Sequence, residues 1–165
     1  MEQSDLIPIP ALPKKRSFLA MPPSEARRYF AWHMETMDAR IRNMETILGL
    51  QLDRSPDSLS LLWQGIRDRH DRVKGRAEAE AQMDAPLFCA GLYLCEVLRT
   101  NHPQLSWTCC KRRIFCWNRP VLQGFGHVYF DPRHMIQVQA SKLYRGEGSE
   151  TQLLDLFEIW IKNLH

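Results

Sequence analysis

The chain has 165 residues with a formal net charge of +3, and it is 44% hydrophobic and 25% charged. This composition is typical of one globular domain and excludes collagen, coiled-coil rods and disordered chains. The longest apolar run, residues 87–98, is too short for a membrane span and contains Glu96. The acidic N-terminus and the prolines that follow it do not fit a signal peptide. We therefore expect a cytoplasmic protein with no membrane partner.

Prolines separate the first 23 residues from the rest of the chain. Because proline cannot donate the hydrogen bond that a helix needs, residues 1–23 predict an extended, proline-rich N-terminal arm. Residues 24–165 predict a single domain.

Three helices are predicted between this arm and residue 104. Apolar residues recur at helical spacing from Ser24 until Gly49, and residues 55–57 are a typical start for a second helix that ends near residue 74. A third helix is expected to begin at residues 84–86 and to end at 101–103. It is apolar around most of its circumference, which indicates a central helix.

The pattern then changes from helix to strand. Residues 105–111 and 114–118 predict a hairpin, and residues 120–131 predict one or two further strands. A helix is expected from 131 to 146, and a last one after a cap at Ser149. This order predicts an α+β fold, in which a bundle of about five helices packs on a small antiparallel sheet formed by the middle of the chain.

Positive charge is concentrated in residues 105–145, which carry seven Lys or Arg and one acid, whereas residues 1–104 are balanced and the last twenty residues are acidic. A basic segment attracts an acidic protein or nucleic acid, although a solvated face neutralised by the acidic C-terminal helix gives the same pattern. Arginine and aromatic residues are the strongest anchors of protein interfaces. The candidate partner-binding residues are Arg112, Arg113, Trp117, Arg119, Tyr129 and Arg133.

Glu96 is the most unusual ionisable residue, because a carboxylate in an apolar helix is costly unless it is paired. A general acid or base beside a cleft is one interpretation. We favour the other, in which Glu96 pairs with Arg99 or with an arginine of the basic segment.

His127, Asp131 and His134 form the densest cluster of titratable residues, and a small hydrolase or metalloprotein could use them. The five cysteines match no zinc-binding spacing, and all five are expected to be reduced, small buried hydrophobic residues. There is neither a phosphate-binding loop nor a nucleophile elbow. We therefore expect no catalytic residue, no metal and no cofactor; the sequence favours a protein without enzymatic activity and leaves that question open.

Several short motifs resemble a family of small uncharacterised bacterial proteins. They begin with Tyr29-Phe30-Ala31-Trp32, then Ser55-Pro56-Asp57-Ser58-Leu59 followed by Leu62-Trp63, then the Gly-Leu-Tyr-Leu-Cys-Glu-Val-Leu run of residues 91–98. Asn118-Arg119-Pro120-Val121-Leu122 and Phe130-Asp131-Pro132 continue the pattern. The resemblance covers most of residues 24–164, with Cys95 where the family more often has glycine. Proteins of this kind are similar to the immunity proteins of bacterial toxin systems.

The resemblance implies a protein that binds a cognate toxin or effector and blocks it, which requires a rigid surface rather than catalysis. A hydrolase or metalloprotein that uses His127, Asp131 and His134 is one alternative. A nucleic-acid-binding module on strands of residues 105–145 is another, but we do not expect nucleic acid as the partner, because the global charge is small and no recognition motif is present.

Overall fold

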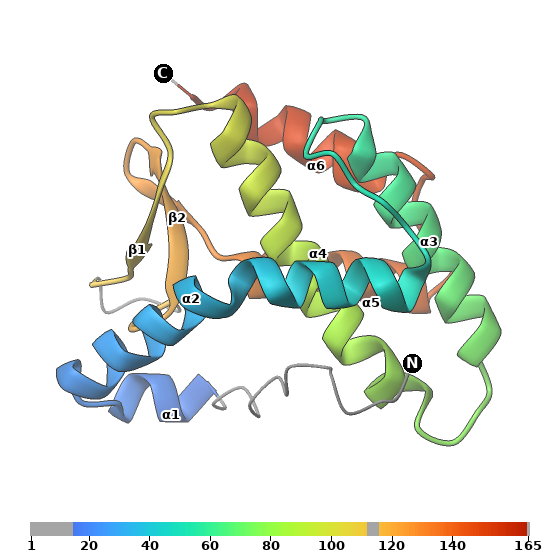
Figure 1. Ribbon diagram of the computed structural model, residues 1–165, viewed down its shortest axis with the longest axis horizontal. Coiled ribbons are helices and arrows are strands. Elements are labelled where there is room, and N and C mark those ends of the chain that lie inside the picture. The colour runs from blue at the N-terminus through green and yellow to red at the C-terminus, as the bar shows by residue number, and fades with distance from the viewer. Residues whose placement is uncertain (1–14, 112–115, 165) are drawn as a thin grey trace.

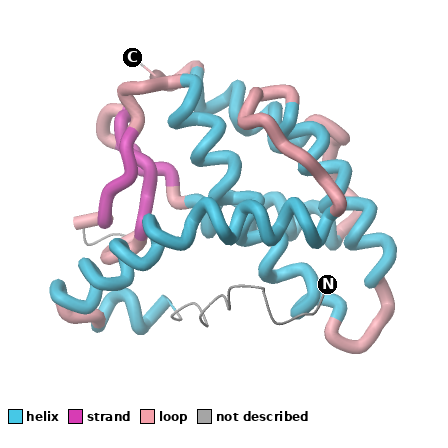
Figure 2. The backbone as a smooth tube through the Cα atoms, viewed as in Figure 1, coloured by secondary structure: helices cyan, strands magenta, loops and turns pink. Residues whose placement is uncertain are grey.

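The computed structural model of the chain (Figure 1) describes residues 15–111 and 116–164, in which six helices and three strands form. The predicted α+β fold is confirmed. Figure 2 shows the three strands together at one side of the helices. None of the helices in these ranges is long and apolar enough to cross a membrane.

The N-terminal segment is not extended throughout. Lys15–Ala20 form helix α1, so the predicted arm over residues 1–23 is wrong for this stretch, and residues 1–14 lie outside the described residues. The prolines that led to the prediction lie on either side, and the sequence between Pro13 and Pro22 has none. Phe18 and Met21 anchor the segment by packing against Ala26 of the next helix.

Helix α2 spans Pro23–Leu48 and ends at Gly49, whose φ of +69° is the left-handed conformation that glycine adopts without strain. Helix α3 spans Ser58–Val73, so residues 55–57 form the turn before the helix rather than its first turn.

Helix α4, Ala79–Asn101, crosses behind α2 in Figure 1 and is the central helix, buried without interruption from Pro86 to Leu98. The predicted start at residues 84–86 is wrong, because Pro86 lies inside the helix. A proline there leaves the carbonyl of Gln82 without its usual donor. Arg69 Nε donates to that oxygen at 3.3 Å, which compensates for the lost hydrogen bond.

The antiparallel sheet has the order β1-β2-β3, formed by Ser106–Cys109, Pro120–Phe125 and Val128–Phe130. The predicted hairpin between 105–111 and 114–118 is wrong: β1 pairs with β2, with Ser106 opposite Gln123 and Cys109 opposite Pro120. Residues 116–118 form a turn, in which Asn118 has a φ of +61° that interrupts extended backbone. Residues 112–115 lie outside the described part of the chain.

Helices α5, Pro132–Tyr144, and α6, Gln152–Ile161, complete the fold. Asp131 caps α5 as predicted, whereas α6 begins after Thr151 rather than directly after the expected cap Ser149. A Cβ atom on Gly91 would lie 2.7 Å from the carbonyl oxygen of Pro132, so glycine permits α5 to begin directly against α4. This contact places the start of α5 beside α2 and β2, where the candidate site lies.

Candidate functional site

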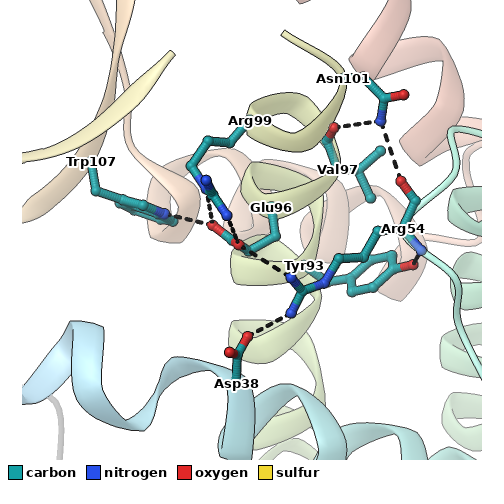
Figure 3. Close-up of polar contacts among 8 residues, drawn as sticks. All are labelled: Asp38, Arg54, Tyr93, Glu96, Val97, Arg99, Asn101 and Trp107. Atoms are coloured by element: carbon teal, nitrogen blue, oxygen red, sulfur yellow. Dashed lines mark hydrogen bonds and ion pairs between the residues drawn. The ribbon is translucent and has the colours of Figure 1, made fainter. Parts of the chain in front are cut away.

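Glu96, on α4, is 1% exposed and accepts three hydrogen bonds (Figure 3). Arg99 donates through Nε at 3.0 Å to Oε1 and through Nη2 at 2.8 Å to Oε2, and Trp107 Nε1 donates to Oε1 at 2.8 Å. The predicted pairing with Arg99 is therefore confirmed. The other predicted partner was an arginine of the basic segment. The second guanidinium near Glu96 instead belongs to Arg54, in the loop after α2, whose Nη1 lies 3.7 Å from Oε2.

Arg54 connects this carboxylate to three further residues, two on α4 and one on α2 (Figure 3). Its backbone N–H donates to the Tyr93 hydroxyl at 2.8 Å, its carbonyl accepts from Asn101 Nδ2 at 3.2 Å, and its side chain pairs with Asp38 of α2 at 2.5 Å. Glu96 thus joins α2, the loop, α4 and β1 through ionic and hydrogen bonds. A carboxylate engaged by three donors serves the structure rather than proton transfer.

A second group of charged residues surrounds a pocket between α1, α2, α4 and the starts of β2 and α5. We call it the Arg119 pocket, and the side chains on which its chemistry depends are Phe18, Tyr29, His33, Arg119, Asp131 and Arg133. It contains about 280 Å³ of space that no atom fills, its open mouth included.

Arg119 and Asp131 form a buried ion pair in the wall of this pocket, with 2.9 Å between Nη1 and Oδ2. The other oxygen, Asp131 Oδ1, accepts from the backbone N–H groups of Arg133 at 3.0 Å and His134 at 3.3 Å. Both carboxylate oxygens are therefore occupied by the fold. His127 and His134 are exposed, and no group of three or more His, Cys, Asp or Glu within residues 15–111 and 116–164 could hold a metal ion.

Three buried polar side chains in or beside the pocket have atoms without a hydrogen-bond partner: both ring nitrogens of His33, Nη1 of Arg40 and Nε of Arg119. Desolvation, followed by the charge of Arg40, lowers the pKa of His33 from 6.5 to about 3, so its imidazole is neutral at physiological pH. Buried polar atoms without a hydrogen-bond partner are unusual in folded proteins, which singles out this part of the structure.

Arg40, at 0% exposure, has no ion-pair partner among the described residues. Its Nη2 donates to the His33 carbonyl at 2.8 Å, and its guanidinium lies 4.7 Å from the Trp32 ring centroid. Aromatic faces stabilise a cation in part. Burial lowers the pKa of Arg40, since no carboxylate offsets the desolvation of its charge.

The six candidate partner-binding residues are not brought together as one cluster. Arg119 and Arg133 line the pocket, whereas Tyr129 is half-buried against Val121 and two cysteines, and Trp117 is half-buried in the preceding turn. Arg112 and Arg113 lie outside the described residues.

Sequence reasoning missed the contribution of α2, namely Tyr29, His33 and Arg40. The available signal was Arg40 itself, because an arginine three residues after Met37 and four before Met44 lies on the buried stripe of the helix.

Among the cysteines, Cys110 and Cys116 form a close pair whose sulfur atoms lie 2.7 Å apart, and both side chains are buried. Desolvation and the contact with Cys110 raise the pKa of the Cys116 thiol. None of the five cysteines forms a disulfide, and four are buried as predicted, whereas the prediction is wrong for Cys109, which is partly exposed.

No family model, no curated protein and no solved structure matches this chain.

Proposed function

We propose that this protein is a bacterial immunity protein that neutralises a cognate toxin or effector by direct protein–protein binding. The observation that carries the proposal is that both buried acids of the candidate sites are engaged in contacts that hold the fold together. Glu96 is engaged by Arg99 and Trp107, and Asp131 by Arg119 and the start of α5. Groups that could have performed acid–base chemistry instead hold the helices and the sheet in fixed positions, which favours a rigid binding surface.

The residue types at the rim of the pocket, and their partial burial, support the same proposal. Tyr29 and Arg133, both half-buried, line an open pocket next to the buried pair of Arg119 and Asp131. Tyrosine and arginine that are partly desolvated on a rigid support are frequent hot spots of protein interfaces. The motifs that resemble the bacterial family add an associational argument.

The contacts of Asp131 weigh against the alternative hydrolase or metalloprotein that uses His127, Asp131 and His134. Asp131 Oδ1 accepts two hydrogen bonds and Oδ2 pairs with Arg119, and within residues 15–111 and 116–164 these three side chains do not form a group that could hold a metal ion.

The proposal is tested by co-expressing the protein with each toxin gene of its own locus and recording growth. We expect one toxin to be neutralised and to co-purify with the protein. Arg133→Glu should weaken this protection, whereas Arg145→Glu, at the far end of α5, is the matched control and should not. If no toxin of the locus is bound or neutralised by the wild type, the proposal is wrong.

A further inference from the structure

We propose that a second cavity, between α3 and the loop that joins α5 to α6, is a binding site for a small phosphate monoester. We call this cavity the α3 cleft. The charged and polar residues that line it are Arg67, His70 and Asp71 of α3, Lys74 directly after that helix, and residues 146–149 of the loop. The cleft is separate from the candidate site, so this binding function is independent of the proposed one.

The two walls of the α3 cleft are held together by the fold. Helix α3 lies beside α6 (Figure 1), and Trp63 Nε1 of α3 donates to the carbonyl oxygen of Ser149 at 3.2 Å. The backbone N–H groups of Gly146 and Glu147 donate to carbonyls in the last turn of α5 at 3.0 and 2.9 Å. A ligand therefore meets walls that are already ordered, which lowers the entropy lost on binding.

Two cations on one side of the cleft are available to an anion. Arg67 and Lys74 are seven residues apart, about two helical turns, and so lie on the same face of α3. Among the described residues the Arg67 guanidinium makes no hydrogen bond, and its one ion pair is to Glu150 Oε1 at 3.8 Å from Nη1. Nη1 is buried, but the side chain is 33% exposed, so a ligand from solvent can reach its other nitrogens. Lys74 is exposed and pairs with no acid of residues 15–111 and 116–164.

Two acids line the same cleft, and each is already engaged by the protein. Glu147 accepts hydrogen bonds from Nε and Nη2 of Arg145, both at 3.0 Å. Asp71 Oδ1 lies 3.3 Å from Nδ1 of His70. The charged groups left for a ligand are therefore the two cations.

The number of unused donors favours a phosphate over a carboxylate. A guanidinium carries five N–H donors and an ammonium carries three. A carboxylate accepts at about four lone-pair sites on two oxygens, whereas a phosphate monoester presents three strong acceptor oxygens and up to about two negative charges. Arginine and lysine are also the side chains that proteins use most to hold phosphate.

The size of the α3 cleft limits what the phosphate can be attached to. The cleft contains about 470 Å³ of space that no atom fills, its open side included. The centre of a water-sized atom fits within about 110 Å³ of this space, and one water molecule needs about 10–15 Å³ of it. There is thus room for roughly seven to ten water-sized groups. This suits the phosphate ester of a small alcohol, and it is too little to enclose a nucleotide.

The first experiment titrates the ¹⁵N-labelled full-length protein with inorganic phosphate and follows the NMR signals of the backbone and of the arginine side chains. Sodium acetate and sodium chloride at equal ionic strength are the controls. We expect saturable shifts at Arg67, Gly146 and Gly148 with phosphate, a dissociation constant of about 1 mM or below, and binding of acetate at least about tenfold weaker. Shifts that do not saturate would overturn the site, and equal affinity for acetate would overturn its assignment to phosphate.

Variants assign the binding to the α3 cleft. Lys74→Gln, an exposed substitution that leaves the fold intact, should weaken phosphate binding about tenfold, since it removes a charged donor. Arg72→Gln is the matched control, because it removes a charge from the same helix at an exposed position outside the cleft. Glu150→Gln should strengthen binding by freeing Arg67 of its acidic partner. Equal effects of Lys74→Gln and Arg72→Gln, or weaker binding by Glu150→Gln, would contradict the site.

The second experiment tests the size of the ligand with glycerol 3-phosphate and adenosine monophosphate. Glycerol 3-phosphate should bind more tightly than inorganic phosphate, because its additional atoms fill the cleft, whereas adenosine monophosphate should gain nothing over inorganic phosphate. Tighter binding of adenosine monophosphate than of glycerol 3-phosphate would overturn the assignment to a small ester. None of these measurements involves a toxin, so their failure and the failure of the proposed function are distinguishable.

Discussion

Arg119 Nη1 lies 2.9 Å from Asp131 Oδ2, and the two side chains are 10% and 2% exposed. This pair joins the start of β2 to the start of α5, and the second oxygen of Asp131 caps that helix. The cap and the ion pair can be separated experimentally, because asparagine caps helices as well as aspartate does but carries no charge.

Asp131→Asn is therefore expected to keep α5 capped and to leave the buried Arg119 cation without its counterion. Breaking a buried pair by removing one partner costs about 3–5 kcal/mol. Denaturant unfolding should show a loss of this size, and the double variant Arg119→Met with Asp131→Asn should recover part of it. A double variant no more stable than Asp131→Asn alone would contradict a cost due to the unpaired charge.

Glu96→Gln is expected to destabilise the protein by about 2 kcal/mol, since it removes charge-assisted hydrogen bonds from a buried site. Glu147→Gln is the matched control. Glu147 also pairs with an arginine through two hydrogen bonds, to Arg145, but both side chains are exposed. Exposed pairs contribute less than about 1 kcal/mol. Equal losses in the two variants would contradict the structural role assigned to Glu96.

His33 makes stability depend on pH. Its pKa is about 3 in the folded protein against 6.5 for an unperturbed histidine, so the unfolded chain binds a proton below pH 6.5 that the folded chain does not. Stability therefore falls as pH falls through this window. Between pH 7 and pH 5 the wild type should lose about 2 kcal/mol more than His33→Phe, measured by urea unfolding. Parallel pH profiles for the two proteins would mean that His33 titrates normally.

Cys110 and Cys116 are expected to form a disulfide when the protein is treated with hydrogen peroxide, because their sulfur atoms are already in contact. The peroxide takes up two electrons and the two thiol hydrogens and is reduced to two molecules of water. Mass spectrometry of proteolytic peptides should find the cross-link in the wild type and in Cys109→Ala, but not in Cys116→Ser. A cross-link that instead involves Cys109 would contradict the arrangement described.

The sequence predicted the fold class because hydrophobic periodicity distinguishes the long helices from the strands. The prediction of individual elements failed where one local sequence pattern is compatible with two different structures. Pro86 is typical of a helix start, but here Arg69 provides the donor that lets it lie inside α4. Residues 114–118 have the composition of a strand, yet Asn118 adopts a turn conformation, and β1 pairs with β2.

The residues of the candidate site could also be predicted only in part. Glu96 and Arg99 are three residues apart on one helix, so their pairing follows from helical geometry. Arg119 and Arg133 were selected by residue type, and both line the pocket. Their neighbours Tyr29 and His33 lie some 90–100 positions earlier in the chain, on α2. Such tertiary contacts leave no mark on spacing within one sequence.

The most direct test of the central claim is the calorimetric affinity of the purified protein for the purified toxins of its own locus, measured for the wild type and for Arg133→Glu. The account predicts that one toxin binds the wild type with a dissociation constant at or below about 10 nM, in the range of tight protein complexes, and that Arg133→Glu weakens this binding at least about tenfold. The absence of binding by every toxin of the locus, or equal affinity of the wild type and Arg133→Glu, would contradict it.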